Sequence, residues 1–446
     1  TVSRSNTIFF IMLLRYTQYR NKSATKWNVH LLQIPYQFNR YFVSFGKKTY
    51  IKMRQIETNL IHTGEEFNKT KAVVAPIYQT STYFADQDPQ EYIAAATEPK
   101  HPEFYHRHGN PTNSQVAAVI AKLEKTEDAL VLATGMAAIS TAILAVVKAG
   151  DHIVAQNAHY SGAMLFLKEF LSEYGITITH VDQTNNQAFV DAIQPNTKLI
   201  YLETPSNPNL DITDLEFVGK LGKDKGILTM VDNTFASPIN QVPSEFGIDV
   251  ILHSATKYLG GHSDLTAGVI CGSKEFIVKA WRRSITLGAS LSPFDSWLLL
   301  RGLKTLSLRV HQINANALAL AEWLEKNPAI KKVSYTGLKS HPQHELAAKQ
   351  LKGHTGMLCI EVAGKDESDE FKNAQTILNN LQLFANAASL GGVESLVVHP
   401  ASMWGSHHSS TQKKISGITL GMLRISVGIE HIDDIIADWE QAIVKI

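Results

Sequence analysis

One lysine stands among small hydroxyl residues at positions 254–264, in the sequence Ser-Ala-Thr-Lys-Tyr-Leu-Gly-Gly-His-Ser-Asp. The segment follows an apolar run at 250–252 that predicts a buried strand. Burial disfavours the ammonium form of a lysine, because desolvation penalises the charge. The neutral amine makes a Schiff base with an aldehyde, so Lys257 is a candidate for covalent binding of an aldehyde cofactor. Taken alone, the segment also fits a surface lysine in a glycine-rich turn.

The surroundings of Lys257 suit a phosphate and a pyridine ring. Ser254 and Thr256 offer hydroxyls, and glycines at 260 and 261 let the backbone approach a ligand closely. Upstream, Asp232 ends the apolar run at 228–231, and ligands of open α/β sheets bind outside the carboxyl ends of strands. A carboxylate there would keep the pyridine nitrogen of pyridoxal phosphate protonated, which makes the ring an electron sink. An N-cap aspartate is the alternative, and the two strand-end motifs in tandem favour the cofactor.

The elements that position these residues follow from the apolar pattern. Between residue 116 and about residue 285, helical patterns alternate with short apolar runs, which predicts a mostly parallel sheet covered by helices. The runs lie at 129–132, 153–155, 176–181, 199–202, 228–231, 250–252 and 267–271. Residues 286–325 predict a long helical connection whose buried side carries Leu298, Leu299, Leu300, Leu303, Leu306 and Leu308. Runs at 332–335, 356–362, 381–385 and 423–427 predict a smaller α+β domain that ends in a helix.

The order of the motifs resembles the Cys/Met-metabolism family of pyridoxal-phosphate enzymes. Its members include cystathionine γ-synthase, cystathionine γ-lyase, methionine γ-lyase and the O-acyl-homoserine sulfhydrylases. The resemblance covers residues 56–446, and many separate motifs match in sequence order. They are Tyr105-His106-Arg107-His108-Gly109-Asn110-Pro111-Thr112, Ala133-Thr134-Gly135-Met136, Glu203-Thr204-Pro205-Ser206-Asn207-Pro208, Ser254-Ala255-Thr256-Lys257, Ser389-Leu390-Gly391-Gly392 and Leu423-Arg424-Ile425-Ser426.

The resemblance implies a role for each candidate residue. Lys257 would be the Schiff-base lysine and proton shuttle, Asp232 would hold the ring nitrogen, and Tyr160 would stack on the ring and act as the acid for the leaving group. Substrate binding would fall to Ser389, Arg424 and Asn207, with the planar guanidinium of Arg424 on the substrate carboxylate. The residues implied to bind the cofactor are Tyr105 and Arg107 from a partner subunit, Gly135 and Met136 at a helix N-terminus, Tyr160, Asn207, Asp232, Thr234, Ser254, Thr256 and Lys257.

The resemblance also implies an α/β fold, that of the fold type I pyridoxal-phosphate enzymes. This fold has a mostly parallel sheet in a large domain and a smaller α+β C-terminal domain. We therefore predict four parts: a basic N-terminal extension outside the fold at 1–52, a turn-rich arm at 53–115 that contributes to the partner's active site, a PLP-binding large domain at 116–305, and a C-terminal domain at 306–446.

The substrate signals in the sequence conflict. Cystathionine synthases and lyases commonly carry glutamates where this chain has Phe104 and Ala388, and an apolar pair suits a thioether or small acyl group better than an ammonium. Methionine γ-lyases usually have a cysteine two residues after the stacked tyrosine, where this chain has Gly162, as the cystathionine enzymes do. Near the C-terminus, Trp404 and Gly405 replace the usual Thr-His of the family.

Charge and composition limit the partners and the compartment. The net charge is +1, yet residues 1–52 hold nine Lys or Arg and no Asp or Glu, so the remainder is net acidic and unsuited to nucleic acid. The extension fits a transit peptide, a basic aromatic arm, or an incidental stretch before Met53, and we favour the last. Cys271 and Cys359 lie in apolar runs, which indicates core thiols and a cytoplasmic protein.

Other site classes find little support in the sequence. No apolar run reaches about 18 residues, so we expect no membrane span. We expect no metal site, because the histidine sets lack companion ligands at zinc-site spacing. The two sets are His101, His106 and His108, and His407 and His408.

The predicted activity is γ-elimination or γ-replacement on a homoserine-derived or thioether amino acid by a PLP-dependent trans-sulfuration enzyme. The alternatives are an O-acylhomoserine sulfhydrylase, a β-eliminating cysteine-type lyase and a catalytically silent homologue. The presence of Lys257, Asp232 and Arg424 argues against the silent homologue. The expected partners are a small amino-acid substrate and further copies of the chain, as a homotetramer built from two dimers.

Overall fold

The computed structural model describes residues 55–85, 87–403 and 417–446. These residues belong to one unit, Gln55–Ile446. The predicted extension at 1–52 lies outside the described residues. The same is true of His407, His408 and the Trp404-Gly405 departure.

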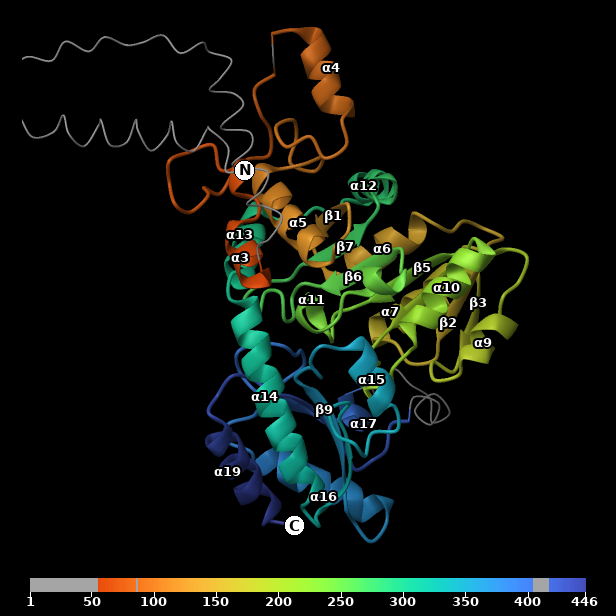
Figure 1. Ribbon diagram of the computed structural model, residues 1–446, viewed down its shortest axis with the longest axis vertical. Helices are drawn as coiled ribbons and strands as arrows, with labels where there is room; N and C mark the ends of the chain where they lie inside the picture. The colour runs from red at the N-terminus through yellow and green to blue at the C-terminus, as the bar shows by residue number, and fades with distance from the viewer. Residues whose placement is uncertain (1–54, 86, 404–416) are drawn as a thin grey trace, which may run out of the picture. The chain divides into compact units, whose positions relative to one another are not determined.

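A seven-stranded sheet with the order β1-β7-β6-β5-β4-β2-β3 forms the larger layer (Figure 1). The strands β6, β5, β4, β2 and β3 pair in parallel, and β7 runs antiparallel to both β1 and β6. The predicted mostly parallel α/β sheet is therefore confirmed. Its strands are β1 (Asp128–Leu132), β2 (His152–Gln156), β3 (Thr177–Val181), β4 (Thr197–Glu203), β5 (Leu228–Asp232), β6 (Val250–Ser254) and β7 (Gly268–Gly272).

Successive residues of the central strands pack on opposite faces of this sheet. In β4, Leu199 and Tyr201 join one hydrophobic cluster, whereas Ile200 and Leu202 join the other. A parallel sheet covered on both faces needs apolar side chains at every position, which is why its strands are continuous apolar runs in the sequence. One face packs against α6 (Gly135–Leu144), α7 (Ser161–Leu165) and α12 (Lys274–Leu287), and the other against α5 (Pro111–Leu123), α10 (Leu215–Lys225) and α13 (Pro293–Leu303).

A second sheet of five strands follows in the C-terminal part, with the order β10-β11-β12-β9-β8. All its pairings are antiparallel except that of β10 with β11. Its hydrophobic core includes Trp439, which is fully buried. The elements are α14 (Leu306–Glu325), β8 (Ile330–Ser334), α15 (His344–Gln350), β9 (Met357–Val362), α16 (Glu367–Asn380), β10 (Ala385–Asn386), β11 (Leu396–Val398), α17 (Pro400–Met403), β12 (Met422–Ser426) and α19 (Ile432–Ile443).

One predicted C-terminal strand was wrong, and one observed strand was missed. The run at 381–385 is not a strand except at its last residue, and β11 was not predicted. The reason lies in α19, where the Asp438 carboxylate accepts hydrogen bonds from the amides of Gln382, Leu383 and Phe384, at 2.8, 2.8 and 3.2 Å. Amides that are bound by a side chain do not pair with a neighbouring strand.

The predicted long connection at 286–325 consists of two helices, α13 and α14, separated by Lys304 and Thr305. Ser292 caps α13 by accepting a hydrogen bond from the Phe294 amide, and proline occupies its first turn. Leu308 was assigned to the buried side, but its side chain is 70% exposed in the single chain.

The arm predicted at 53–115 is more helical than its turn-rich sequence indicates. It contains α3 (Ile56–His62), a 3-10 turn (Glu65–Phe67) and α4 (Pro89–Thr97). Helix α5 crosses the predicted boundary at residue 115, because Asn110 caps it and Pro111 begins it. The division into arm, large domain and C-terminal domain stays a prediction.

The remaining short elements connect the strands of the larger sheet. They are a π-helical turn (Phe166–Phe170), α8 (Leu171–Glu173), α9 (Asn186–Asp191), α11 (Ser237–Asn240) and a 3-10 turn (Pro243–Phe246). Cys271 in β7 and Cys359 in β9 are buried free thiols, as predicted. Within the described ranges, no helix has the length and apolarity to cross a membrane, and no three His, Cys, Asp or Glu side chains gather as metal ligands would.

Candidate active site

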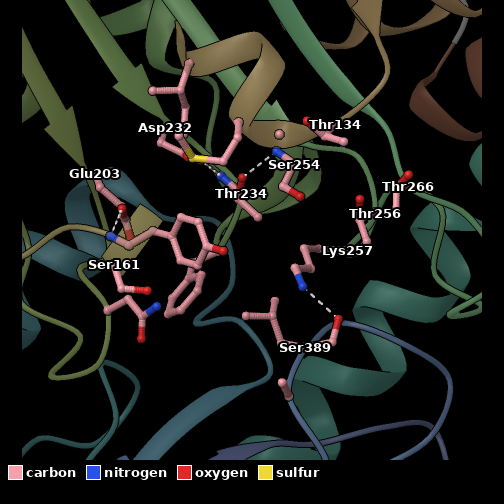
Figure 2. Close-up of a pocket in the computed structure, with 18 of the residues that line it drawn as sticks. Thr134, Ser161, Glu203, Asp232, Thr234, Ser254, Thr256, Lys257, Thr266 and Ser389 are labelled. Carbon is pink, nitrogen blue, oxygen red and sulfur yellow. Dashed lines mark hydrogen bonds between the residues drawn. The ribbon is translucent and has the colours of Figure 1, made fainter. Parts of the chain in front are cut away.

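A cavity of about 370 Å³ lies at the carboxyl ends of β4, β5 and β6 (Figure 2). It brings together every sequence-predicted site residue except Tyr105 and Arg107. The predicted residues that line it are Gly135, Met136, Tyr160, Asn207, Asp232, Thr234, Ser254, Thr256, Lys257, Ser389 and Arg424. The carboxyl ends of neighbouring parallel strands meet at one edge of a sheet, which accounts for this convergence.

Lys257 lies in the turn that follows β6, where its backbone N–H donates to the Ser254 carbonyl. Its Nζ donates to Ser389 Oγ at 2.7 Å, as Figure 2 shows. Burial, and secondarily the Arg424 guanidinium, lower the pKa of Lys257 to about 8. About a tenth of the side chain is therefore free amine at pH 7, far more than for an ordinary lysine, and the free amine is the nucleophilic form.

One end of the cavity has the donors that a phosphate needs. Thr134 caps α6 by accepting from the Ala137 amide, so the Gly135 and Met136 amides lie at the open start of the helix. The hydroxyl residues Ser254 and Thr256 line the same cavity. A Cβ at position 135 would lie only 2.7 Å from the Ser254 Cβ, so this approach requires glycine. A helix N-terminus with nearby hydroxyls favours an anion.

Asp232, at the end of β5, supplies the carboxylate that a protonated ring nitrogen needs. Its Oδ1 accepts from the Thr234 amide at 2.9 Å, while Thr234 Oγ1 accepts from the Ser254 amide at 2.8 Å. Burial, and secondarily Glu203, raise the pKa of Asp232 to about 6. Asp232 is thus mostly ionised at neutral pH, and no Lys or Arg of the described segments forms an ion pair with it. A cationic ligand would complete this site.

Arg424 on β12 presents a buried guanidinium to the cavity. Its Nη1 donates to Asn207 Oδ1 at 3.3 Å and its Nη2 donates to the Ser389 carbonyl at 3.2 Å. Burial lowers the pKa of Arg424, and within the described parts of the chain no carboxylate lies within ion-pair distance. A buried guanidinium with only neutral partners is suited to bind a carboxylate ligand.

Ser389 adopts a backbone conformation with φ of 106°, which is rare for a residue with a side chain. This conformation directs its hydroxyl to Lys257 and its carbonyl to Arg424 at once. Strain of this kind is typical of functional sites, where surrounding structure maintains it. No sequence pattern indicated it.

Tyr160 precedes α7, and its side chain is 46% exposed along the cavity. Its backbone N–H donates to Glu203 Oε2 at 2.7 Å. A Cβ at position 162 would approach the Tyr160 ring to 2.6 Å, so Gly162 leaves room for that ring position. Gly162, which stands where methionine γ-lyases usually have a cysteine, thus has a steric reason in this structure.

Glu203 was not predicted as a site residue, although it lines the cavity and is almost fully buried. The signal was present, because Glu203 ends β4 as Asp232 ends β5. Thr266 and Met403 also line the cavity and were not predicted. Of the apolar pair used to infer the substrate, Ala388 lines the cavity, whereas Phe104 packs against Tyr92 and His108 elsewhere.

Tyr105 and Arg107 do not line the Lys257 cavity of their own chain. Arg107 Nη1 donates to the Ile285 carbonyl at 2.6 Å, and its side chain borders a second cavity with His106 and Trp281. The Tyr105 side chain is 40% exposed. Their predicted service to a partner's cofactor remains a prediction.

The donor set fits pyridoxal phosphate. The N-terminus of α6, with Ser254 and Thr256, suits a phosphate. Asp232 suits a protonated pyridine nitrogen, and the amine of Lys257 suits an aldehyde. The three groups line a single cavity, together with a guanidinium for an acidic substrate.

Comparisons with known proteins agree with this chemistry. A family model described as Cys/Met metabolism PLP-dependent enzyme matches residues 57–444. L-Methionine gamma-lyase of Fusobacterium nucleatum subsp. nucleatum is 39% identical over 399 residues, which cover 89% of this chain and the whole of that protein. Cystathionine gamma-lyase of Bacillus subtilis is 42% identical over 394 residues, which cover 87% and 99%. The crystal structure of metB from Corynebacterium glutamicum superposes with a TM-score of 0.82 at 37% identity, over 88% of this chain and 99% of that one.

Proposed function

The chain belongs to the Cys/Met metabolism PLP-dependent enzymes, and we propose that it cleaves the bond between the γ-carbon and its substituent in a thioether or homoserine-derived L-amino acid. The observation that carries the proposal is the joint position of Lys257, Asp232 and Arg424 around one cavity. The curated relatives include a methionine γ-lyase and a cystathionine γ-lyase, which supports γ-elimination.

In the proposed mechanism, Arg424 and Ser389 orient the substrate carboxylate, and Asn207 keeps the guanidinium in place. Lys257 takes the proton from the α-carbon and returns protons to later positions of the substrate. Asp232 would keep the ring nitrogen of the cofactor protonated, and α6, Ser254 and Thr256 would hold its phosphate. When bound, the cofactor supplies a ring that draws negative charge away from the α-carbon.

Tyr160 is proposed as the acid that protonates the departing γ-substituent. Its side chain borders the cavity and remains partly exposed, so a substrate thioether can reach it. For methionine, elimination with one water gives methanethiol, ammonia and 2-oxobutanoate. In γ-replacement, a thiol takes the place of the departing group instead.

A product assay tests the reaction type. We expect purified holoenzyme to form 2-oxobutanoate from methionine, or from cystathionine with release of cysteine. Formation of pyruvate from cystathionine without 2-oxobutanoate would instead establish β-elimination and contradict the proposal. O-acyl-homoserine supplied with cysteine or sulfide measures the share of replacement against elimination.

The substrate end of the cavity leads to a prediction on specificity. Ala388 lines the cavity and offers no charge to the distal ammonium of cystathionine. We therefore expect Ala388→Glu to raise kcat/KM for cystathionine relative to methionine. Because a charge-assisted hydrogen bond contributes ~1.5–3 kcal/mol and position 388 is exposed, we expect a change of about tenfold.

Ala388→Gln provides the matched control, since it adds similar volume without charge. A fall in the cystathionine preference of Ala388→Glu, or an equal rise in Ala388→Gln, would show that another group recognises the distal end. Neither result would affect the assignment of Lys257.

We further propose that Tyr105 and Arg107 complete the site of a second copy, in a cytoplasmic homotetramer of two dimers. The shared site is supported because Arg107 does not line the Lys257 cavity of its own chain. The cytoplasmic location is supported by the buried free thiols of Cys271 and Cys359. Mixing the inactive variants Arg107→Ala and Lys257→Ala should restore about a quarter of wild-type activity, because about half of the dimers are then hybrids with one intact site. Lack of activity after verified subunit exchange would show that Arg107 acts in the active site of its own chain or in no active site.

A further inference from the structure

Glu203 and Asp232 are neighbours at the carboxyl ends of β4 and β5, where the strand register pairs them directly. Both side chains are buried, and both line the cavity. Paired residues of adjacent strands point to the same face of a sheet, so the two carboxyl groups lie close together. Two buried carboxylates in such positions cannot both ionise without a large energetic penalty.

No Lys or Arg in the described segments forms an ion pair with Glu203, and the Arg424 guanidinium acts on it only from beyond ion-pair distance. The nearest basic group is His159, whose Nδ1 lies 3.8 Å from Glu203 Oε2. The His159 ring stacks on the Tyr201 ring at 4.6 Å between centroids, and both of its nitrogens lack hydrogen-bond partners. Burial lowers the pKa of His159 to about 3, so the imidazole is neutral. The charge of a Glu203 carboxylate would therefore be balanced only in part, by Arg424 at longer range.

The position of Glu203 is fixed on several sides. Gln156 Oε1 accepts from the Glu203 amide at 3.1 Å, and Gln156 Nε2 donates to the Glu203 carbonyl at 2.7 Å. The Glu203 side chain in turn accepts from the Tyr160 amide at 2.7 Å. The backbone of Tyr160 is thus attached to the sheet through this one carboxyl group.

We propose that Glu203 is a positioning residue that works in its uncharged form. In this form it holds Tyr160 over the cavity, and Asp232 is then the charged member of the carboxyl pair that ends β4 and β5. The inference rests on the proposed function only in treating the cavity as the reaction site. The groups that face Glu203 are His159 and Tyr160 before α7, Tyr201 on β4, Asp232 on β5 and Arg424 on β12.

The pH dependence of stability follows from the direction of the shift. Burial raises the pKa of Glu203 to about 8, against the opposing effects of the Tyr160 amide and Arg424. The unfolded chain releases this proton above about pH 4.5, whereas the folded chain keeps it to about pH 8. Between these values the folded state binds more protons, so the contribution of Glu203 to stability falls as pH rises.

The melting temperature of Glu203→Gln holoenzyme relative to wild type tests the charge state. Glutamine has a similar shape and stays uncharged, so its advantage in Tm should grow from about pH 5 to about pH 8 and then level off. Tyr201→Phe is the control, since burial raises the pKa of Tyr201 and its hydroxyl lacks a partner. Its Tm difference from wild type should be the same from pH 5 to pH 9, below the range in which a tyrosine titrates.

Kinetics of the same holoenzymes test the positioning role. At pH 7, Glu203→Gln should keep kcat/KM within about threefold of wild type, whereas Glu203→Ala should lose about tenfold because the Tyr160 amide loses its acceptor. The ratio of Glu203→Gln to wild type should rise between pH 7 and pH 9, since only the wild type acquires a second charge beside Asp232. The titration of Lys257 is common to both proteins and cancels in this ratio.

A Tm difference that is flat from pH 5 to pH 9 would overturn the uncharged state of Glu203. A loss of kcat/KM in Glu203→Gln as large as that in Glu203→Ala would overturn its positioning role. If the Tm difference follows the expected course but wild type cleaves none of the proposed substrates, the proposed function fails while the inference on the charge state stands.

Discussion

Lys257→Ala is expected to lower kcat for γ-elimination by about 10³-fold or more. Removal of the amine eliminates both the attachment point for an aldehyde cofactor and the base at the α-carbon, and a single acid–base group contributes about 10²–10⁴-fold. The Ser389 hydroxyl would lose its donor but keep its strained backbone conformation. Steady-state measurement of 2-oxobutanoate release gives the size of the loss.

Lys372→Ala provides the control, because Lys372 is an exposed residue on α16 in the C-terminal part. We expect this variant to match wild type in kcat and in cofactor content. A Lys257→Ala protein that retains more than about a tenth of wild-type kcat would show that a different group performs the proton transfer.

Arg424→Leu is expected to produce the second large effect, a rise in KM and a fall in kcat/KM of about 10²–10⁴-fold. The guanidinium offers two donors to a carboxylate, and each hydrogen bond to a charged group contributes ~1.5–3 kcal/mol. Arg424→Lys keeps the charge but not the planar fork, so we expect an intermediate loss. The measurement is the loss of kcat/KM in Arg424→Leu with methionine, compared with the loss with the methionine analogue that lacks the carboxylate.

Wild type and Arg424→Leu should handle the decarboxylated analogue equally, because the missing interaction is then absent from both. An equally large loss with the analogue would indicate a structural defect instead. Arg424 also contributes, after burial, to the lowered pKa of Lys257. The pKa of Lys257 should therefore rise in Arg424→Leu, and cofactor uptake by the apoenzyme at neutral pH should slow, because less free amine is present.

The strands of the larger sheet were predictable because burial on both faces leaves a continuous apolar run. Each predicted run, such as 250–252 for β6, lies within or overlaps the observed strand. Local pattern was insufficient in the C-terminal part, where the short β11 has only three residues. The segment before β10 has the apolar pattern of a strand but does not form one. Its amides are bound by Asp438, a residue more than 50 positions away, which the local pattern does not reveal.

The helical connection shows the same limit. Leu308 fits the leucine pattern of α14, yet it is exposed in the single chain, because the pattern does not reveal which side of a helix its neighbours cover. The break between α13 and α14 depends on how both helices pack.

Part of the cavity was predictable because polar residues follow apolar runs at neighbouring strand ends, and the remaining residues were implied by the resemblance to a known family. Asp232 and Ser254 end β5 and β6, and Lys257 lies in the turn after β6; Glu203 ends β4 in the same way but was overlooked. Other features depend on three-dimensional contacts. The φ of Ser389, the stacking of His159 on Tyr201 and the steric need for Gly162 leave no mark in the sequence.

Borohydride reduction of the holoenzyme, followed by peptide mass mapping, tests most directly whether Lys257 is the residue that holds the cofactor. Reduction converts the bond between a lysine amine and the cofactor aldehyde into a stable secondary amine. We expect the added mass of the reduced cofactor on the peptide that contains Lys257, and on no other peptide. The added mass on a different lysine, or on no lysine while the cofactor remains bound, would contradict the proposed active site.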